Sequence, residues 1–151
     1  MPGVSFRRGI ASDADHLRSL MLDGVRHWGH DVNHPEAFAG LEQDSPDGEE
    51  VAGTPTWVAE SGGRAIAFYS LREHEDHVEL YQMFMETDRI GTGLGRVLWD
   101  HAVTEAARYS TRMRIDSDPM AIGFYEAMGA RPDRRIEVAP GFELTQLWYD
   151  L

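Results

Sequence analysis

The 151-residue chain contains no cysteine, and all 14 of its basic residues are arginine, so it also contains no lysine. Without cysteine it cannot form a disulfide, a thiolate zinc site or a thiol nucleophile. No apolar run approaches the roughly 18 residues of a membrane-spanning helix. The first ten residues, MPGVSFRRGI, lack the apolar segment of a secretory signal. Together these absences predict a cytoplasmic protein that does not enter a membrane.

Negative charge dominates the composition. Asp and Glu number 26 against 14 basic residues, which gives a formal net charge of −12. Such a charge argues against nucleic acid, whose binding depends on cationic contacts with phosphate, and it attracts cationic partners. Solubility alone is also a sufficient explanation for the charge. The length and the hydrophobic content of 42% predict a single domain over residues 1–151.

Hydrophobic periodicity predicts alternating helices and strands joined by polar turns. Strands are expected at 4–10, 56–61, 64–73, 77–86, 112–116, 134–139 and 142–151, and helices after Ser12 or Asp13 and at 35–41, 93–109 and 120–130. The segments 27–34 and 42–55 are expected to be irregular loops. Antiparallel hairpins precede one β-α-β unit in this order, which predicts an α/β fold with a mixed sheet and helices on its faces.

Three glycines alternate in the segment 88–99, DRIGTGLGRVLW, just before a predicted helix. Gly91, Gly93 and Gly95 permit positive φ angles and let a ligand touch the main chain. The first amides of a helix lack partners and bind phosphates well, and Arg96 adds a cation there. A tight turn without a ligand is the alternative interpretation. Three glycines in alternation favour a loop that holds an anion.

Two familiar phosphate-binding patterns fit this loop poorly. A dinucleotide-binding loop has the spacing G-x-G-x-x-G, and Arg96 stands where its third glycine would fall. Asp116 lies near the position of the acidic residue that such a site needs. A P-loop is excluded because no G-K-[ST] sequence follows. A dinucleotide-binding oxidoreductase therefore stays as an alternative function.

The segment TDRIGTGLGRVLWDHAV resembles the acyl-CoA pyrophosphate loop of the GNAT superfamily of N-acetyltransferases, whose pattern is [QR]-x-x-G-x-[GA]. Ile90 occupies the first position of that pattern, and Arg89 lies one residue earlier. Downstream, DPMAIGFYEAMGA resembles the family's N-x-x-A-x-x-F-Y-x-x-x-G-F helix, with Asp118 in place of Asn and Ala130 in place of the last Phe. The resemblance covers nearly the whole chain. It implies a GNAT-like acyl-CoA N-acyltransferase fold with a twisted mixed sheet of about seven strands and helices on both faces.

The resemblance also implies that acetyl-CoA is the co-substrate and that no metal is required. Main-chain amides around Thr92 would hold the diphosphate, and the amide of Met85 would polarise the thioester carbonyl. The implied coenzyme-binding residues are Met83, Phe84, Met85, Ile90, Gly91, Thr92, Gly93, Leu94, Gly95, Arg96 and Asp118.

Two residues are candidates for proton transfer. In the resembling family a carboxylate on the strand before the loop acts as the base, and Glu79 holds that position here. Tyr125 matches the tyrosine that lies near the coenzyme sulfur, where its hydroxyl could protonate the leaving thiolate. A solvent-facing Glu79 and a packing role for Tyr125 are the alternatives. Strand alternation places Glu79 on one face with Tyr81, Met83 and Met85, unless a bulge intervenes.

Histidines cluster in two places, His27, His30 and His34 in one segment and His74 and His77 in another. A metal site is conceivable, but the irregular loop predicted at 27–34 does not fix the ring directions, so an ordinary polar loop is favoured. In the resembling family this region borders the acceptor cleft. The implied acceptor-binding residues are Trp28, His30, Asp31, His34 and Tyr81.

The sequence thus predicts an N-acetyltransferase that moves the acetyl group of acetyl-CoA to a primary amine of a small molecule or peptide. Direct attack in a ternary complex is expected, because no cysteine can carry an acyl intermediate. The acidic charge favours a cationic acceptor. The protein would act as a monomer or homodimer. A non-catalytic acyl-CoA-binding sensor or partner module and the dinucleotide oxidoreductase are the alternatives.

Overall fold

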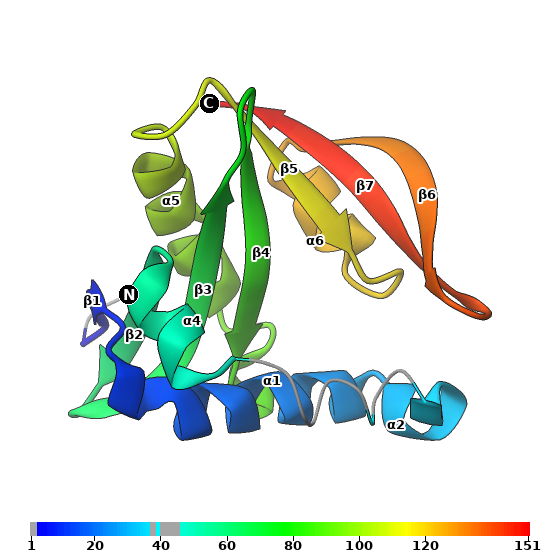
Figure 1. The fold of residues 1–151 in the computed structure, drawn as a ribbon. Coiled ribbons are helices and arrows are strands. Elements are labelled where there is room, and N and C mark those ends of the chain that lie inside the picture. Colours follow the sequence, from blue (N-terminus) through cyan, green and yellow to red (C-terminus); the bar gives the residue numbers. More distant parts are fainter. Residues whose placement is uncertain (1–2, 37–38, 40–45) are drawn as a thin grey trace. The chain divides into compact units, whose positions relative to one another are not determined.

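The computed structural model describes residues 3–36, 39 and 46–151, apart from the side chain of Asp31. In chain order its elements are β1 (Ser5–Arg8), η1 (Ala11–Asp13), α1 (Ala14–His27), α2 (His30–Asn33), α4 (Gly48–Gly53), β2 (Thr56–Ser61), β3 (Arg64–Glu73), β4 (Val78–Met85), η2 (Thr87–Arg89), α5 (Leu94–Ala106), β5 (Arg112–Ser117), α6 (Ile122–Ala127), β6 (Arg131–Ala139) and β7 (Phe142–Asp150) (Figure 1). Within the described ranges, no helix combines the length and the apolar character needed to cross a membrane.

The strands among the described residues form a mixed sheet of seven in the order β1-β2-β3-β4-β5-β7-β6. β4 and β5 pair in parallel, with Glu79 opposite Arg114. α5 lies between these two strands in the chain, as the connection of a parallel pair requires. The pairs β1–β2, β2–β3, β5–β7 and β6–β7 are antiparallel. The predicted mixed α/β sheet is confirmed.

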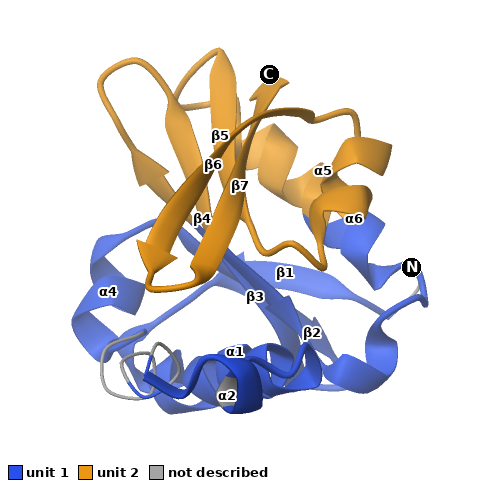
Figure 2. Cartoon of the chain, turned by 90° about the vertical axis from the view of Figure 1, so that its right-hand side faces the viewer, with its two compact units in different colours: residues 1–70, 82–98 blue, residues 71–81, 99–151 orange. Residues whose placement is uncertain are grey.

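The chain divides into two compact units, which Figure 2 shows in blue and orange. Unit 1 comprises residues 1–70 and 82–98, and unit 2 comprises residues 71–81 and 99–151. The division falls within β3, β4 and α5, so each of these elements contributes residues to both units. A single domain over residues 1–151 stays a prediction.

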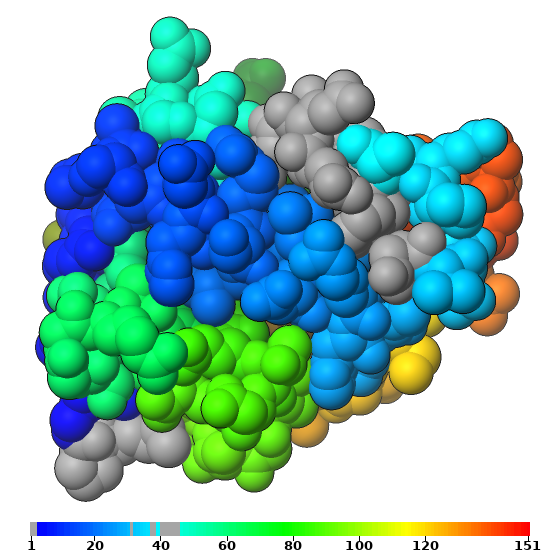
Figure 3. Space-filling view, turned by 90° about the horizontal axis from the view of Figure 1, so that it is seen from below, coloured from blue at the N-terminus to red at the C-terminus, as the bar shows by residue number. Residues whose placement is uncertain are grey.

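The core of unit 1 forms where α1 packs on strands of the sheet. The apolar face predicted for this helix, Leu17, Leu20, Met21 and Val25, is buried. It clusters with Val58 of β2 and Phe68 of β3, and Phe84 packs against the same cluster. Burial of each large apolar side chain contributes about 1.5–3 kcal/mol. The outer surface of α1 is the bright-blue band that crosses the middle of Figure 3.

β4 contains one residue more than the matching part of β3. The His74 amide donates to the His77 carbonyl at the hairpin end, and the Glu86 amide donates to the Ile66 carbonyl at the other end, both at 2.9 Å. Between these two hydrogen bonds the β3 side advances by eight residues, from Ile66 to His74. The β4 side advances by nine, from His77 to Glu86. The extra residue is a β-bulge, which breaks the alternation of side chains. The shared face predicted for Glu79, Tyr81, Met83 and Met85 therefore does not extend along all of β4.

Two predicted loops contain helical turns. Residues 48–53 form α4, because the Asp47 side chain caps this helix by accepting from the Glu50 amide at 2.8 Å, and Glu49 and Glu50 lie in its first turn. Residues 30–33 form α2, which follows Gly29 in a left-handed conformation with φ 79°. The prediction of irregular loops was wrong at both places. Most of the helix predicted at 35–41 lies outside the described residues.

Unit 2 contains the antiparallel strands β5, β7 and β6 together with α6 and most of α5. Gly129 ends α6 with φ 101°, and the Ala130 amide donates to the Tyr125 carbonyl at 3.0 Å. The predicted C-cap at Gly129 is therefore confirmed. Trp99 is 2% exposed and meets Tyr149 edge to face at 5.0 Å between ring centroids. Its burial was not predicted.

A pair of glycine substitutions tests the packing of α1. A Cβ atom at Gly24 would lie 2.9 Å from Phe84 Cδ1, whereas nothing lies within 4 Å of one at Gly123 in α6. We expect Gly24→Ala to lower the free energy of unfolding by about 1–3 kcal/mol through overpacking. Gly123→Ala should raise it by about 0.5–1 kcal/mol, the usual gain in a helix. Urea denaturation measures both, and equal stability of the two variants would contradict the tight contact.

Candidate active site

The glycine loop between η2 and α5 belongs to unit 1 and has the open backbone that its sequence predicts. Gly91 and Gly93 have φ angles of 83° and 95°, a left-handed conformation that other residues rarely adopt. Apart from the glycine and its two chain neighbours, no heavy atom of the described residues lies within 4 Å of the position that a Cβ would take at either glycine. The side chains that the structure describes therefore do not fill the space beside these glycines.

The free amides lie slightly later in the loop than expected. The Thr92 amide donates to the Arg89 carbonyl at 3.2 Å, and the Thr92 hydroxyl donates to the same carbonyl at 2.5 Å. α5 begins at Leu94, so the amides of Leu94, Gly95 and Arg96 have no acceptor within the helix. They lie at the positive end of the helix dipole. An anion would therefore be held by the amides that follow Gly93.

Arg96 is the cation available at this helix start. Arg89 donates from Nε to Glu86 Oε1 at 3.0 Å, and Arg64 binds both oxygens of the same carboxylate. Arg89 therefore does not replace the side chain that the family pattern has at Ile90. Arg96 is exposed and forms no ion pair with the described part of the chain.

The end of β4 leads directly into η2 and the glycine loop. Met83, Phe84 and Met85 are all half-buried. The Phe84 ring lies 6.0 Å from the Phe68 ring and packs against the α1 cluster, so its side chain serves the core of unit 1. At Phe84 only the backbone is left to meet a ligand.

Glu79 is buried in unit 2, at 8% exposure, and is not the solvent-facing residue that was the alternative. Its Oε1 atom lies 2.9 Å from His74 Nε2 and 3.0 Å from Arg114 Nη2. The parallel register of β4 and β5 brings Arg114 opposite Glu79. Because both contacts converge on Oε1, Oε2 is the oxygen left to accept a proton.

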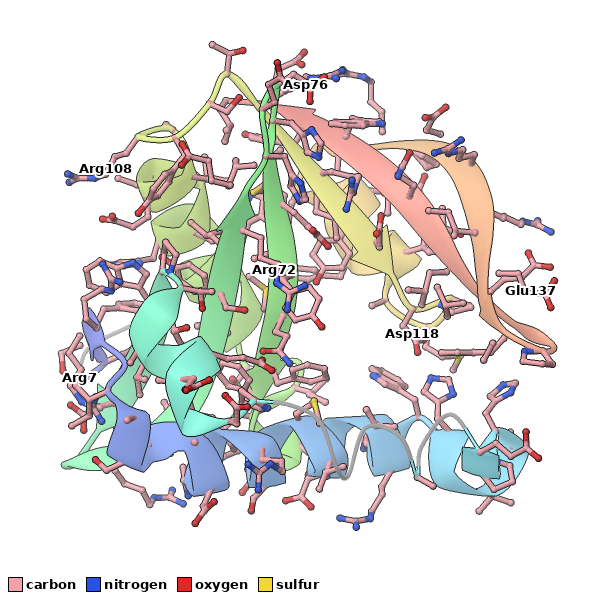
Figure 4. All side chains as sticks on the ribbon, viewed as in Figure 1. Arg7, Arg72, Asp76, Arg108, Asp118 and Glu137 are labelled. Carbon is pink, nitrogen blue, oxygen red and sulfur yellow. The ribbon has the colours of Figure 1, made fainter. Side chains whose placement is uncertain are left out.

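The network around Glu79 continues through His77. Arg114 Nη1 lies 3.1 Å from His77 Nε2, and a guanidinium can only donate, so Nε2 accepts. His77 Nδ1 then carries the proton and donates to Asp76 Oδ1 at 2.6 Å. This bond, with the nearby Arg112, lowers the pKa of the Asp76 carboxyl. Figure 4 labels Asp76 at the tip of the β3–β4 hairpin.

The two histidine pairs do not build a metal site among the residues that the structure describes. His74 and His77 stack at 4.5 Å between ring centroids and are bound to carboxylates. His30 and His34 lie 5.6 Å apart. No group of three or more possible ligands forms in the described ranges.

Tyr125 lies inside unit 2, on α6, at 9% exposure. Its ring contacts Phe124 at 5.2 Å and Trp99 at 5.8 Å. Burial, and then the negative charge of Asp118, raise the pKa of the Tyr125 hydroxyl. The phenol therefore stays protonated near neutral pH, although the same shift makes it a weaker acid. Phe124, predicted as the core residue of this pair, is only half-buried.

Asp118 fixes the turn that enters α6. Its Oδ1 accepts from the Met120 amide at 2.7 Å, and its carbonyl accepts from the Ala121 amide at 3.0 Å. Figure 4 labels Asp118 in this turn. A capping role therefore accompanies the coenzyme contact that the resemblance implies for it.

The predicted acceptor-binding residues fall into both units. Trp28 and His34 follow the last residues of α1 and α2 in unit 1, and His30 lies within α2. The side chain of Asp31 lies outside the described residues. Tyr81 of unit 2 is 37% exposed, and Arg72 Cζ lies 3.3 Å from its ring centroid. Arg72 and Arg114 were not predicted, because a single arginine within a strand belongs to no recognisable motif.

Comparison with known proteins identifies the family. Residues 17–149 match the model of the acetyltransferase (GNAT) domain. The chain is 33% identical over 139 residues to the peptidyl-lysine N-acetyltransferase YjaB of Escherichia coli, which covers 89% of this chain and 87% of that protein. It is 34% identical over 86 residues to YjaB of Salmonella typhimurium, covering 56% of this chain and 55% of that protein.

A solved structure shows the same fold. The PaiA N-acetyltransferase of Thermoplasma acidophilum, in complex with coenzyme A, matches with a TM-score of 0.82 at 11% identity, over 98% of this chain and 99% of that one. The chain therefore belongs to the GNAT acetyltransferase family. This confirms the predicted family and fold. It favours an acetyltransferase over the sensor and the dinucleotide oxidoreductase.

Two arginine substitutions test whether the charge of Arg114 is required beside Glu79. Arg114→Met leaves a buried carboxylate without its cation, and we expect a loss of about 3 kcal/mol in the free energy of unfolding. The matched control is Arg131→Met, whose pair with Asp150 at 3.3 Å is exposed on both sides. It should cost less than about 0.5 kcal/mol. Chemical denaturation at neutral pH measures the free energy of unfolding of both variants. Similar losses in the two would show that Glu79 does not need the charge of Arg114.

Proposed function

We propose that this chain transfers the acetyl group of acetyl-CoA to a primary amine. The observation that carries the proposal is the left-handed, unfilled glycine loop at the start of α5, in a chain of the GNAT acetyltransferase family. Such a helix start binds a diphosphate through backbone amides. The solved PaiA relative was crystallised with coenzyme A, which supports this donor.

In unit 1 the proposed roles fall on the backbone. The amides of Leu94, Gly95 and Arg96 would bind the diphosphate, with the Arg96 guanidinium as counter-charge. The amide of Met85 would donate to the thioester carbonyl as its oxygen becomes negative. The predicted contacts of Ile90, Gly91, Thr92 and Met83 stay predictions.

In unit 2 the proposed roles fall on two side chains. Glu79 Oε2 takes a proton from the acceptor ammonium, directly or through one water. The free amine attacks the thioester carbon, and a C–N bond forms. The nitrogen, now positively charged, loses its second proton to water as the C–S bond breaks. The thiolate leaves with the bonding electron pair and takes a proton from the Tyr125 hydroxyl, which regains one from water. Arg114 would hold this carboxylate in place, because its Nη2 atom lies 3.0 Å from Oε1 of Glu79.

The acceptor class follows from the relatives. Both YjaB proteins are named for peptidyl-lysine, and we propose a lysine side chain, in a peptide or a small molecule, as the acceptor. The net charge of −12 favours cationic over anionic molecules close to the protein surface. A cytoplasmic location and a monomeric or homodimeric state stay predictions from the sequence.

A pair of loop substitutions tests coenzyme binding. Gly93→Ala adds a Cβ at a left-handed position in the proposed site, and Gly63→Ala does so in the β2–β3 turn, where φ is 77°. Nothing lies within 4 Å of either Cβ position. Both should cost about 1–2 kcal/mol of stability from backbone strain. Only Gly93→Ala should reduce the rise in melting temperature produced by acetyl-CoA. An equal rise in both variants and the wild type would contradict the proposed site.

Two further substitutions test the chemistry. Glu79→Gln and Tyr125→Phe should each lower kcat by about 10²–10⁴-fold, because each removes one proton transfer. Coenzyme release is followed with a thiol reagent, using a lysine peptide as acceptor. The matched controls are Glu73→Gln, at an exposed position of β3, and Tyr109→Phe, both expected to keep wild-type turnover. Undiminished turnover in the Glu79 and Tyr125 variants would exclude the assigned roles.

A further inference from the structure

Arg72 and Tyr81 form a stacked pair on the exposed side of unit 2. Arg72 projects from β3 over the neighbouring β4 (Figure 4), with Cζ 3.3 Å from the Tyr81 ring centroid. At this separation the planar guanidinium rests on the face of the ring. Stacking uses the face of the guanidinium and leaves the N–H groups along its edge to donate.

Arg72 differs from its neighbours in having no carboxylate partner. Three other arginines of unit 2 have a carboxylate partner, Arg112 with Asp76, Arg114 with Glu79 and Arg131 with Asp150. Within the described residues, no hydrogen bond or ion pair joins Arg72 to an acidic group. The ion pairs of nearby Glu79 are with His74 and Arg114 instead. A half-buried, orientated guanidinium is thus left with free donors.

The pair lies next to the proposed base. Tyr81 follows Glu79 by two residues in β4, and Leu80 between them is buried at 4% exposure while Tyr81 is 37% exposed. Residues 78–80 of β4 pair with β5 without a register shift, and two positions along a strand span about 7 Å, so the backbone of Tyr81 lies about that far from Glu79. A ligand whose amine reaches Glu79 would therefore place a second group beside Arg72.

We propose that Arg72, held flat on Tyr81, binds a carboxylate of the acceptor, so that the enzyme selects amines that carry one. This inference rests on the proposed function and names the acceptor more closely. The carboxylate is either the α-carboxylate of the lysine itself or an Asp or Glu side chain beside it in a peptide. The overall negative charge does not oppose this contact strongly, because charges beyond about 8 Å are screened at physiological salt.

The test uses two pairs of acceptors that differ only in the carboxylate. One pair is Nα-acetyl-lysine and its C-terminal amide, and the other is a blocked Ala-Glu-Lys-Ala peptide and its Glu-to-Gln counterpart. The measured quantity is the ratio of kcat/KM for the acid to that for the amide. In the wild type we expect a ratio of about ten or more in one pair, as a charge-assisted bidentate contact gives. The pair that shows it identifies the source of the carboxylate.

Arg72→Met should bring the ratio near one, and Tyr81→Leu should lower it by removing the support. Tyr81→Phe keeps the ring and should retain the preference. The matched control is Arg8→Met, since Arg8 of unit 1 also stacks on an aromatic ring, that of Trp57, at 5.6 Å. Its ratio should stay at the wild-type value. Melting temperatures show whether each variant is folded.

Equal rates for acid and amide in both pairs would overturn the inference, as would a preference that persists in Arg72→Met. Calorimetric binding of the same acceptors to the coenzyme-loaded protein separates this inference from the proposed function. If no amine is acetylated but the acid still binds more tightly through Arg72, the proposed function fails and the carboxylate site stands. If acetylation proceeds without a preference, only the carboxylate site fails.

Discussion

A buried carboxylate stays charged only beside a cation or several hydrogen-bond donors, and Glu79 has Arg114 and His74 at 3.0 and 2.9 Å. This contact depends on the parallel register of β4 and β5, which sets Arg114 opposite Glu79. Arg114 also contacts His77, which in turn is bound to Asp76. The polar interior of unit 2 is therefore one connected network of side chains around Glu79.

The two units contribute chemistry of different kinds. Unit 1 offers backbone amides at the start of a helix, a fixed dipole that does not titrate. Unit 2 offers a carboxylate and a phenol, groups that gain or lose protons. Burial acts differently on these two kinds of group. Exposed glycines at positions 91 and 93 leave the loop accessible, whereas the burial of Tyr125 raises the pKa of its hydroxyl and keeps it protonated.

Most of the fold could be predicted from the sequence, because the strands and longer helices have a clear hydrophobic periodicity. The buried face of α1, the Gly129 cap and the open glycine loop followed from local rules about packing and left-handed backbone. α4 was missed because its glycine-rich, acidic sequence is typical of a loop, while the decisive signal was the Asp47 cap. The bulge in β4 left no mark in the sequence.

The partners of the site residues could not be predicted in the same way. Arg114 lies opposite Glu79 because β4 pairs with β5, a strand more than 30 residues later in the chain. Arg72 lies over Tyr81 because β3 and β4 are neighbours in the sheet. The occupied amide of Thr92 likewise depends on how the chain folds back on Arg89. Sequence motifs thus indicated which backbone is open at the start of a helix, but not which charges surround Glu79.

Because every basic residue of the chain is arginine, its side chains resist acetylation by its own acyl donor. Each cation named at the site, Arg72, Arg96 and Arg114, carries a guanidinium, which stays protonated at neutral pH and has no lone pair with which to attack a thioester. A lysine amine, by contrast, is a nucleophile toward a thioester once it has lost its proton. Because none of the 151 residues is lysine, no side chain of this chain offers an amine to its own chemistry. The positive charges of the chain therefore cannot be lost through acetylation of a lysine side chain.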